Sequence, residues 1–222
     1  MAPNIHYADK FQPRFGVPWV PPLKPEQLAT MSDAELRQYA SHRHMVETKM
    51  QENPVGWGWA PPVWDQVMDN FCKYNVHILL GGNQSSKTTF GARMAVWAAS
   101  TIPEAEVYGF HISDRRSIDD QQRFVYESLP ENLRNLATKK GTYHSLQYSQ
   151  KNGFTDSIAI LPPSKGYRRG GSIKFYNFAQ FAQNSQIIEG IKAHFVWADE
   201  KIPYDLFETI RMGRLGTYHG RM

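Results

Sequence analysis

The spacing of apolar residues predicts a helical N-terminal part of the chain. Ser32 followed by Glu35 forms a capping-box pattern, which opens a helix over residues 33–52. Upstream, residues 12–25 contain five prolines and are expected to form an extended arm instead of a packed element. A second helix begins at the Pro61-Pro62 pair, and one face of it carries Trp64, Val67, Met68 and Phe71.

From residue 75 the pattern changes to alternating strands and helices. Short apolar runs are typical of strands buried in a parallel sheet. The predicted strands are Val76–Leu80, Val107–Ile112, Ile158–Leu161, Ile173–Phe178 and His194–Ala198. Helices are predicted over 87–100, from residue 117 (capped by Ser117 or Asp120) and from Pro203. This alternation predicts an α/β fold with a mainly parallel sheet over residues 55–222, preceded by the arm and helix of residues 1–54.

Composition narrows the class of protein. The chain has 222 residues, of which 41% are hydrophobic and 21% are charged, as in an ordinary globular protein. It holds no apolar run of the roughly 18 to 20 residues that a membrane-spanning helix needs. Its first ten residues lack the basic start and apolar stretch of a secretory signal. A single cysteine, Cys72, excludes an internal disulfide framework, so we expect an intracellular globular protein with no membrane partner.

Positive charge is concentrated in residues 139–174. This tract holds seven lysines and arginines against one acidic residue, Asp156. The basic residues are Lys139, Lys140, Lys151, Lys165, Arg168, Arg169 and Lys174, and the aromatic residues between them are Tyr143, Tyr148, Phe154, Tyr167, Phe175 and Tyr176. Such a tract attracts phosphate-rich partners, and aromatic rings can stack on bases. The alternative is a solvated hairpin whose aromatic side chains face the core.

A phosphate-binding loop is predicted after the strand that ends at Leu80. The loop nearly matches the G-x-x-x-x-G-K-[ST] pattern and consists of Gly81, Gly82, Asn83, Gln84, Ser85, Ser86, Lys87 and Thr88. Small residues let backbone N–H groups surround phosphates at the N-terminus of a helix, whose partial positive charge favours anions. Lys87 is expected to neutralise the β and γ phosphates of a nucleotide, and the Thr88 hydroxyl to ligate Mg²⁺. The alternative is a serine-rich turn that binds nothing.

One position departs from this pattern, because Ser86 stands where the second glycine is expected. A serine is tolerated there if its φ angle is negative, since only a positive φ strongly favours glycine. We therefore expect Ser86 to have a negative φ and to begin the helix.

A pair of acidic residues follows the last predicted strand. Asp199 is expected to hold Mg²⁺ through water, and Glu200 to orient and deprotonate the attacking water. Two adjacent carboxylates in these roles distinguish hydrolases from proteins that only bind nucleotides. Alone, an Asp-Glu pair is common as the solvated end of a strand. Its occurrence together with the loop at Gly81–Thr88 supports the functional interpretation.

Gln66 lies on the helix before the first predicted strand, near Trp64. The amide of a glutamine at this place can bind the edge of an adenine, with an aromatic or proline neighbour as a platform. The alternative is an exposed glutamine on an amphipathic helix.

Together these segments resemble a known protein family. The similarity is to the ATPase domain of the large terminase subunit of tailed bacteriophages, and it lies in GGNQSSKT and in QIIEGIKAHFVWADEKIPYDLFETIRMGRLGTYHGRM. It covers residues 55–222 and implies an ASCE/RecA-like P-loop ATPase core that is incomplete in this chain. The resemblance implies that Gly81–Thr88 is the phosphate loop, Asp199 the metal-associated acid, Glu200 the catalytic base and Gln66 the adenine contact.

Members of this family are DNA-packaging motors with an N-terminal ATPase domain and a C-terminal nuclease domain. The resemblance implies that this chain hydrolyses Mg-ATP to drive double-stranded DNA into a viral procapsid. The implied partners are double-stranded DNA, further copies of the chain in a homo-oligomeric ring on a portal protein, and the small terminase subunit. The implied location is the cytoplasm of a bacterial host and, transiently, the portal of the procapsid.

Two departures from the family concern the arginine that stabilises the transition state. Members often have an arginine inside the phosphate loop, where this chain has Gln84, and many carry Arg-Gly upstream of the acidic pair, where it has Glu189-Gly190. The arginine must then come from elsewhere. The candidates, acting within the chain or on a neighbouring subunit, are Arg168, Arg169, Arg115 and Arg116.

The basic tract is the expected DNA-binding surface. Its predicted contacts are Lys165, Arg168, Arg169 and Lys174. Lysine and arginine side chains there are expected to meet DNA phosphates and not base edges. Binding should therefore be sensitive to salt and independent of sequence.

The resemblance also predicts that the chain is a fragment. In this family the next segment contains a coupling motif and a further strand, inserted between the strand of the phosphate loop and the strand of the acidic pair. Without that strand the sheet is expected to expose two unpaired edges. No nuclease residue can be named from this sequence.

Two other functions stay open from the sequence. One is a different P-loop translocase on nucleic acid, such as a helicase-like motor. The other is a nucleotide-gated DNA-binding module that does not hydrolyse ATP, which Ser86 and Gln84 favour.

Overall fold

The computed structural model describes most of the chain. The residues it describes are 23–58, 62–71, 73–74, 76–81, 85–134, 136, 144–183, 191 and 193–211. The expected arm of residues 12–25 lies mostly outside these ranges, as do Gly82, Asn83 and Gln84 of the predicted phosphate loop.

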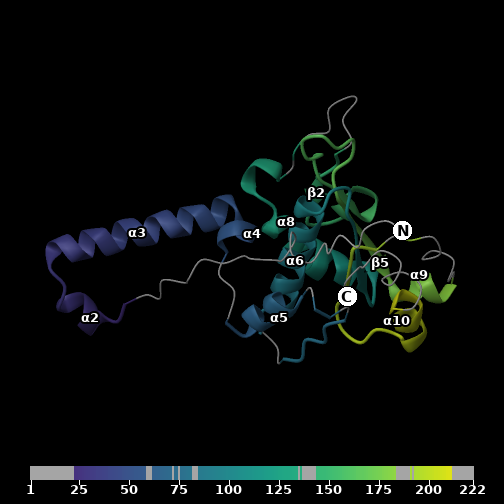
Figure 1. Cartoon of the computed structure of the whole chain (residues 1–222), viewed down its shortest axis with the longest axis horizontal. Coiled ribbons are helices and arrows are strands. Elements are labelled where there is room, and N and C mark those ends of the chain that lie inside the picture. The colour runs from purple at the N-terminus through teal and green to yellow at the C-terminus, as the bar shows by residue number, and fades with distance from the viewer. Residues whose placement is uncertain are drawn as a thin grey trace.

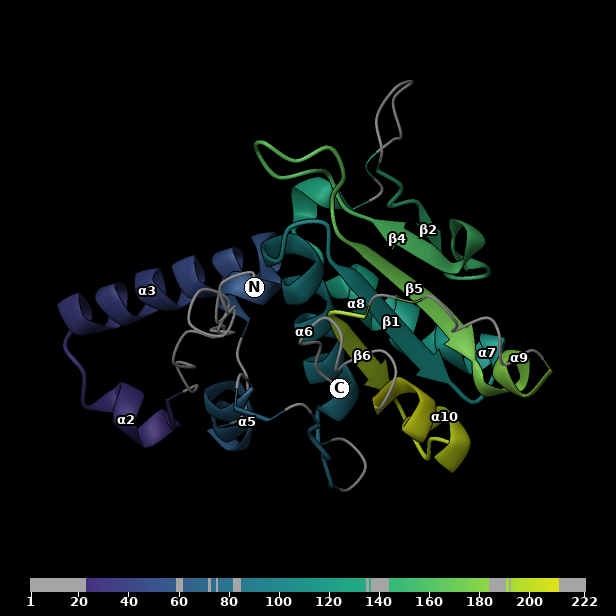
Figure 2. The ribbon, with the colours of Figure 1, turned by 45° about the vertical axis from the view of Figure 1, so that its right-hand side comes forward.

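A four-stranded sheet lies at the centre of the fold (Figures 1 and 2). Its strands are β1 (Glu106–His111), β4 (Ile158–Ile160), β5 (Ser172–Asn177) and β6 (Phe195–Ala198), in the order β4-β5-β1-β6. Strand β1 runs parallel to β5 on one side and to β6 on the other, whereas β4 is antiparallel to β5. The predicted α/β fold with a mainly parallel sheet is confirmed at this level. A separate antiparallel pair joins β2 (Tyr148–Ser149) to β3 (Gly153–Phe154).

Helices connect and cover these strands. The α-helices are α2 (Pro25–Ala29), α3 (Asp33–Glu52), α4 (Pro54–Trp57), α5 (Asp65–Asn70), α6 (Lys87–Thr101), α7 (Asp114–Arg116), α8 (Arg123–Ser128), α9 (Phe178–Gln183) and α10 (Tyr204–Ile210). Short 3₁₀ turns lie at Pro62–Trp64, Glu131–Leu133 and Thr155–Ser157, and a π-helical turn at Ser117–Gln122 joins α7 to α8.

The core has two parts, one on each face of the sheet. Successive strand residues point to opposite faces, so Val107 of β1 packs into the cluster that includes α6, and Tyr108 packs into the cluster that includes α10. Helix α6 is rich in alanine and is buried along most of its length. The sheet therefore has helices on both faces, which explains why its parallel strands are continuous apolar runs.

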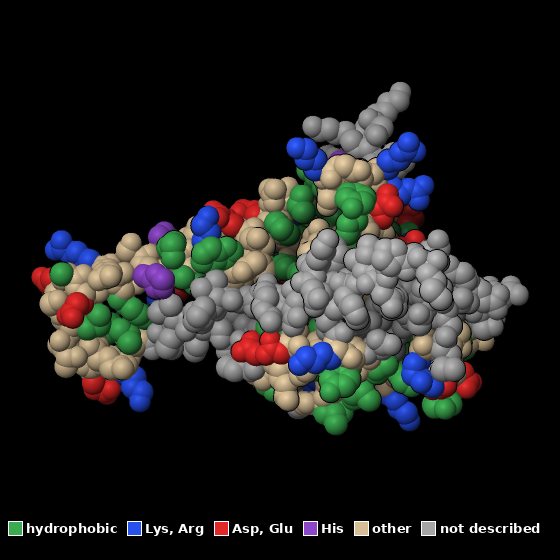
Figure 3. All heavy atoms as spheres, in the orientation of Figure 1, with side chains coloured by type: hydrophobic (Ala, Val, Ile, Leu, Met, Phe, Trp, Pro, Cys, Tyr) green, Lys and Arg blue, Asp and Glu red, His purple; other side chains and the backbone are tan. Residues whose placement is uncertain are grey.

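Helix α3 projects from the body of the molecule (Figures 1 and 2). It spans the predicted residues, and the capping box is present: the Ser32 N–H donates to Glu35 Oε2 at 2.8 Å. Val46 is its one buried residue, and its surface carries charges of both signs and histidines (Figure 3). Within the described ranges, no helix combines the length and apolar character needed to cross a bilayer.

The predicted strand at Val76–Leu80 is wrong. Residues 76–81 form no strand, and Ile78 and Leu80 are 77% and 88% exposed. An apolar run becomes a strand only where a neighbour accepts its backbone hydrogen bonds. Within the described part of the chain, β6 pairs with β1 alone, and no strand lies on its other edge. That edge and residues 76–80 line one apolar cavity of about 1040 Å³, which we name the β6-edge cavity.

The helix predicted from about residue 117 is present, but it begins at Asp114, and the predicted caps are wrong. Helix α7 begins earlier, because the Ser113 hydroxyl caps it by accepting a hydrogen bond from the Arg116 N–H at 3.3 Å. Ser117 and Asp120 instead lie within the π-helical turn that continues the helix.

We predict that the chain self-associates through the β6 edge and that Ile78→Lys reduces this self-association. A strand edge that has no partner among the described residues and lies beside exposed apolar side chains is a template for pairing with another chain, and a charge placed there opposes it. Size-exclusion chromatography with light scattering over a range of concentrations measures the effect. Val63→Lys is the matched control, because Val63 is 61% exposed but does not line the cavity. Equal effects of the two substitutions would contradict this prediction.

Candidate functional site

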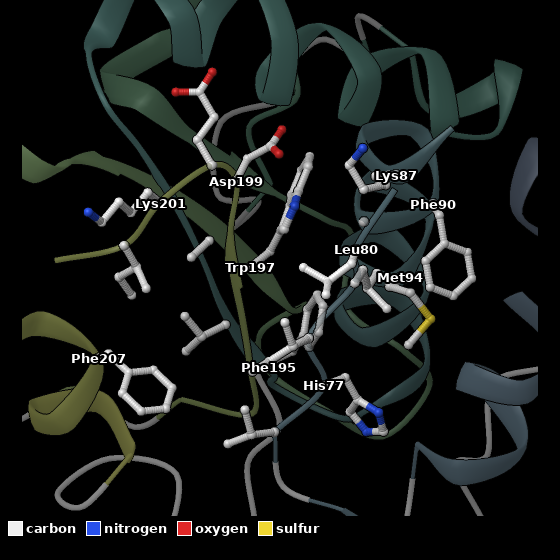
Figure 4. Close-up of a pocket in the computed structure, with 18 of the residues that line it drawn as sticks. His77, Leu80, Lys87, Phe90, Met94, Phe195, Trp197, Asp199, Lys201 and Phe207 are labelled. Atoms are coloured by element: carbon white, nitrogen blue, oxygen red, sulfur yellow. The ribbon is translucent and has the colours of Figure 1, made fainter. Parts of the chain in front are cut away.

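The two motifs predicted from the sequence meet in space. The Thr88 hydroxyl, at the start of α6, donates a hydrogen bond to Asp199 Oδ2 at 3.1 Å, although the two residues are 111 positions apart. Figure 4 shows Lys87 and Asp199 near the same end of the β6-edge cavity. The structure therefore brings a basic side chain, a hydroxyl and a carboxylate together at one edge of the sheet.

Strand pairing determines where Asp199 lies. Ala198 is paired with Phe110 of β1, and the next residue, Asp199, donates its N–H to the Phe110 carbonyl at 3.1 Å. The carboxyl ends of parallel strands share one edge of the sheet, so Asp199 emerges at the edge where ligands commonly bind in such folds.

Close packing of α6 against β6 brings Thr88 to this carboxylate. Gly91, one turn after Lys87, faces Trp197 of β6, and a β-carbon at Gly91 would lie 2.5 Å from Trp197 Cε2. Such a contact is too short for any side chain, so glycine is required for the helix to approach the strand this closely. A larger residue would separate Thr88 from Asp199.

The Lys87 side chain folds back over the loop that precedes it. Its Nζ donates to the Gly81 carbonyl at 2.6 Å and to Ser85 Oγ at 3.0 Å. A β-carbon at Gly81 would lie 2.8 Å from Ser85 Oγ, so the two ends of the loop lie close together. The ammonium group thus lies beside the N-terminus of α6, where an anion is favoured electrostatically.

Ser86 departs from the expected backbone conformation. Its φ and ψ are 61° and 16°, in the left-handed region, so the prediction of a negative φ is wrong. Its side chain is held by two hydrogen bonds: Ser86 Oγ donates to the Ser85 carbonyl at 2.6 Å and accepts from Trp64 Nε1 at 2.9 Å. Ser86 therefore has a backbone conformation that glycine adopts more readily, and its side chain is fixed by its neighbours.

Burial dominates the electrostatics of Asp199. It raises the pKa of this carboxyl above the ordinary value, because the charged form loses solvation. The Thr88 hydroxyl, the nearby His111 and the Glu200 N–H oppose that shift by stabilising the carboxylate. A cation beside Asp199 would act in the same direction.

Glu200 differs from Asp199 in both exposure and backbone. It is exposed, and its φ of 69° lies in the left-handed region. Non-glycine residues held in this region are strained and are concentrated at functional sites. The exposed carboxylate of Glu200 is thus in contact with solvent beside the half-buried carboxylate of Asp199.

The donor atoms at this site suit Mg²⁺. Thr88 and Asp199 offer a hydroxyl and a carboxylate oxygen, the ligand class that this ion prefers, and nucleotide-bound Mg²⁺ needs only one or two protein ligands besides phosphates and water. The described residues contain no group of three His, Cys, Asp or Glu side chains that could hold a metal ion by themselves. The site therefore fits a metal that arrives with phosphates better than a resident metal.

Gln66, the predicted adenine contact, is exposed on α5. Its backbone carbonyl accepts a hydrogen bond from Asn70 Nδ2 at 2.8 Å. The side chain of this segment that reaches the loop is Trp64, which is 4% exposed. The sequence predicted that Gln66 is the functional residue of this segment, whereas in the structure Trp64 is the residue that contacts the predicted phosphate loop, at Ser86.

The basic residues 165, 168 and 169 lie at the opposite end of the parallel strands from Asp199. They are exposed in the loop between β4 and β5, at the amino end of β5, whereas Asp199 follows the carboxyl end of β6. The base of this loop is closed by a hydrogen bond from the Leu161 N–H to the Gly171 carbonyl at 2.9 Å. Arg168 and Arg169 are therefore not brought together with Lys87 and Glu200 within one chain.

Lys174 is separate from this exposed loop. Its Nζ lies 3.6 Å from Glu106 Oε2 and 5.4 Å from the centre of the Tyr108 ring. The Lys174 ammonium thus interacts with two side chains of the neighbouring strand β1. Among the aromatic residues of the basic tract, Phe154 and Phe175 are buried in the core, as the alternative interpretation expected.

Tyr167 is the exposed aromatic residue of the loop, at 48%. Lys139, Lys140 and Tyr143 lie outside the described residues, as does the Glu189-Gly190 pair.

Arg115 and Arg116 lie at the same end of the parallel strands as Asp199, because α7 follows the carboxyl end of β1. Both are exposed and form ion pairs along the helix, Arg115 with Asp119 at 2.8 Å and Arg116 with Asp120 at 3.7 Å. Such exposed pairs are weak and can be exchanged for a phosphate.

Sequence reasoning missed two buried polar residues beside the site. His111 ends β1 and is 1% exposed. Gln121, in the π-helical turn, donates from Nε2 to the carbonyls of Phe110 and Trp197 at 3.1 and 3.4 Å, and so joins β1 to β6. A polar residue directly after an apolar strand was the available signal for His111, whereas nothing in the local sequence marks Gln121.

Comparison of the chain with protein-family models, with curated proteins and with solved structures found no match. What this site does is therefore inferred from its own geometry and chemistry.

We predict that Asp199→Asn stabilises the chain in the absence of nucleotide and metal, and that the gain grows with pH. Because burial raises the pKa of Asp199, the folded state binds the proton more tightly than the unfolded state. Its contribution to the free energy of unfolding is complete below the ordinary pKa of 3.8 and is lost as the pH rises through the raised value. Asparagine does not ionise and avoids this loss.

Thermal melts followed by circular dichroism between about pH 4 and pH 8 measure the difference in Tm. Asp205→Asn, at an exposed carboxyl on α10, is the control for loss of a negative charge. A Tm difference that does not increase with pH would contradict the prediction.

Proposed function

We propose that this chain is the ATPase part of a DNA-packaging motor of the large-terminase kind, which hydrolyses Mg-ATP and moves double-stranded DNA. The hydrogen bond between Thr88 and Asp199 carries the hydrolysis part of this proposal. A hydroxyl after a lysine at a helix N-terminus, facing a carboxylate at a strand end, is the arrangement that P-loop nucleotide hydrolases use. The resemblance of the two motifs to large terminase subunits supports the more specific part.

Each side chain has a role that follows from its position. Bound Mg²⁺ would neutralise charge on the phosphate oxygens. Thr88 and Asp199 would hold it, directly and through water. The Lys87 ammonium would exchange its present acceptors, the Gly81 carbonyl and Ser85 Oγ, for phosphate oxygens, because hydrogen bonds between charged groups are stronger. Glu200, exposed beside Asp199, would accept a proton from the attacking water.

The transition-state arginine would come from one of two places. Arg115 and Arg116 lie, like Asp199, at the carboxyl end of the parallel strands and can act within the chain. Arg168 and Arg169 lie at the amino end of the parallel strands, so they could serve only the site of a neighbouring copy. The second arrangement requires the homo-oligomeric ring on a portal that the resemblance implies, with small terminase subunits as further partners.

A second candidate is a module that binds nucleotide and DNA without hydrolysis. It is favoured by the segment before the loop, since residues 76–81 are not held in the sheet. A loop whose preceding segment is outside the sheet can bind phosphates and still fail to align an attacking water. Turnover measurements separate the two candidates.

We predict that Lys87→Ala abolishes ATP binding and hydrolysis, and that Glu200→Gln lowers turnover by about 100-fold or more while ATP still binds. The first change removes the phosphate-binding charge, and the second removes only the proton acceptor. Release of phosphate measures turnover, and calorimetry with Mg-ATP measures binding. Glu47→Gln, an exposed carboxyl on α3, is the control. Near-normal turnover by Glu200→Gln would contradict its role as base, and tight binding without turnover by the unmodified chain would favour the second candidate.

We predict that reversing the charges of the loop between β4 and β5 weakens binding to duplex DNA. The triple variant changes Lys165, Arg168 and Arg169 to glutamate. Fluorescence anisotropy with a labelled duplex at several salt concentrations should show weaker binding, and a salt dependence whose log–log slope is smaller by about 2 to 3. Reversal of three exposed basic residues of the N-terminal helices, Lys24, Arg37 and Lys49, is the matched control. Unchanged affinity at low salt would exclude a DNA-binding role for this loop.

A further inference from the structure

We infer that Trp64 is a positioning residue for the nucleotide site: its indole N–H fixes Ser86 in the left-handed conformation that the phosphate loop requires. This inference rests on the proposed function. It deepens that function by assigning the geometry of the loop to a tryptophan from a different part of the chain.

Ser86 occupies a conformation that disfavours it. With φ at 61°, its β-carbon crowds the following backbone, a cost that glycine does not have. An L-residue stays in this region only where its surroundings hold it there. Something other than the intrinsic preference of serine must therefore stabilise this turn.

The hydroxyl of Ser86 supplies that stabilisation through two contacts. It donates to the Ser85 carbonyl at 2.6 Å and accepts from Trp64 Nε1 at 2.9 Å. A negative φ would move the hydroxyl away from Trp64 and leave a buried indole N–H without this acceptor. Because unsatisfied buried donors are costly, the contact favours the left-handed form.

Trp64 is itself rigidly held, so it can act as a fixed reference. Its side chain is 4% exposed, and its ring stacks on Phe90 with centroids 5.0 Å apart and an interplanar angle of 18°. Phe90 and Ser86 are joined by the hydrogen bond from the Phe90 N–H to the Ser86 carbonyl at 2.8 Å. Trp64 therefore contacts the first turn of α6 at two points.

The consequence for the site follows from the order of the residues. Ser86 directly precedes Lys87 and Thr88, so its torsion angles fix the direction in which both side chains leave the loop. Thr88 reaches Asp199, and Lys87 reaches Gly81 and Ser85, only with this turn in place. The hydrogen bond of Trp64 goes to Ser86, so its indole N–H acts on these groups through Ser86.

A double-mutant cycle tests this role in the full chain with Mg-ADP as the probe. Trp64→Phe keeps an aromatic ring for stacking on Phe90 but removes the N–H donor. We expect it to raise the Kd of Mg-ADP about 5-fold, equivalent to about 1 kcal/mol, when residue 86 is serine. In the Ser86→Gly background, where no hydroxyl is present, the same substitution should change the Kd by less than about 2-fold.

Two further substitutions separate the hydroxyl from general effects on packing. Ser86→Ala keeps the β-carbon in the disfavoured conformation and loses both hydrogen bonds, so it should bind Mg-ADP more weakly than Ser86→Gly. Trp97→Phe, at a buried tryptophan farther along α6, should change the Kd less than Trp64→Phe does.

A spectroscopic measurement tests the contact without nucleotide. In a ¹⁵N–¹H spectrum, the indole signal assigned to Trp64 by its loss in Trp64→Phe should be protected from solvent exchange, and Ser86→Gly should remove that protection. Absence of nucleotide binding by the unmodified chain would contradict the proposed function. Binding that neither Trp64→Phe nor Ser86→Ala alters, or an unprotected indole N–H, would contradict only the role of Trp64.

Discussion

The close approach of helix α6 to strand β6 is the constraint on which the candidate site depends. It is possible because Gly91 has no β-carbon and packs directly against the Trp197 indole. With the helix at this distance, the Thr88 hydroxyl reaches Asp199. The same residue, Asp199, is fixed by the pairing of β6 with β1. Lys87 and Thr88 at the start of α6 therefore meet Asp199 because a glycine lets the helix pack directly on the Trp197 indole of the strand.

The site is supported unequally on its two sides. On one side, β6 is paired with β1, and Gln121 joins the two strands through their carbonyls. On the other side, residues 76–80 lie along the β6-edge cavity without strand pairing in the described part of the chain. Trp64 compensates locally, because it ties the loop to α6 through Ser86. On this side the loop is thus held by a side-chain hydrogen bond, whereas on the other side the site is held by strand pairing.

Local patterns predicted those features that depend on local physics. The capping box at Ser32 predicted α3, and the apolar runs predicted β1, β5 and β6 to within a residue or two. The strand at residues 76–80 could not be judged in this way, because an apolar run shows where a strand is favourable and not whether a neighbour is present. Strand pairing is a property of the whole fold.

The candidate site shows the same division. The sequence predicted that the phosphate loop and the acidic pair would meet, and Thr88 lies 3.1 Å from Asp199. The backbone conformation of Ser86 was not predictable, since it depends on Trp64, 22 positions away in the chain. Lys174 was grouped with the exposed basic residues because it is near them in sequence, but its place in β5 puts it beside Glu106.

A crystal structure of the chain with Mg²⁺ and a non-hydrolysable ATP analogue is the most direct test of this interpretation. The terminal phosphate should lie within hydrogen-bond distance of Lys87 Nζ, with Mg²⁺ bound to the Thr88 hydroxyl and joined to Asp199 through water. A nucleotide bound elsewhere, with Lys87 still donating to Gly81 and Ser85, would show that this edge of the sheet is not a nucleotide site.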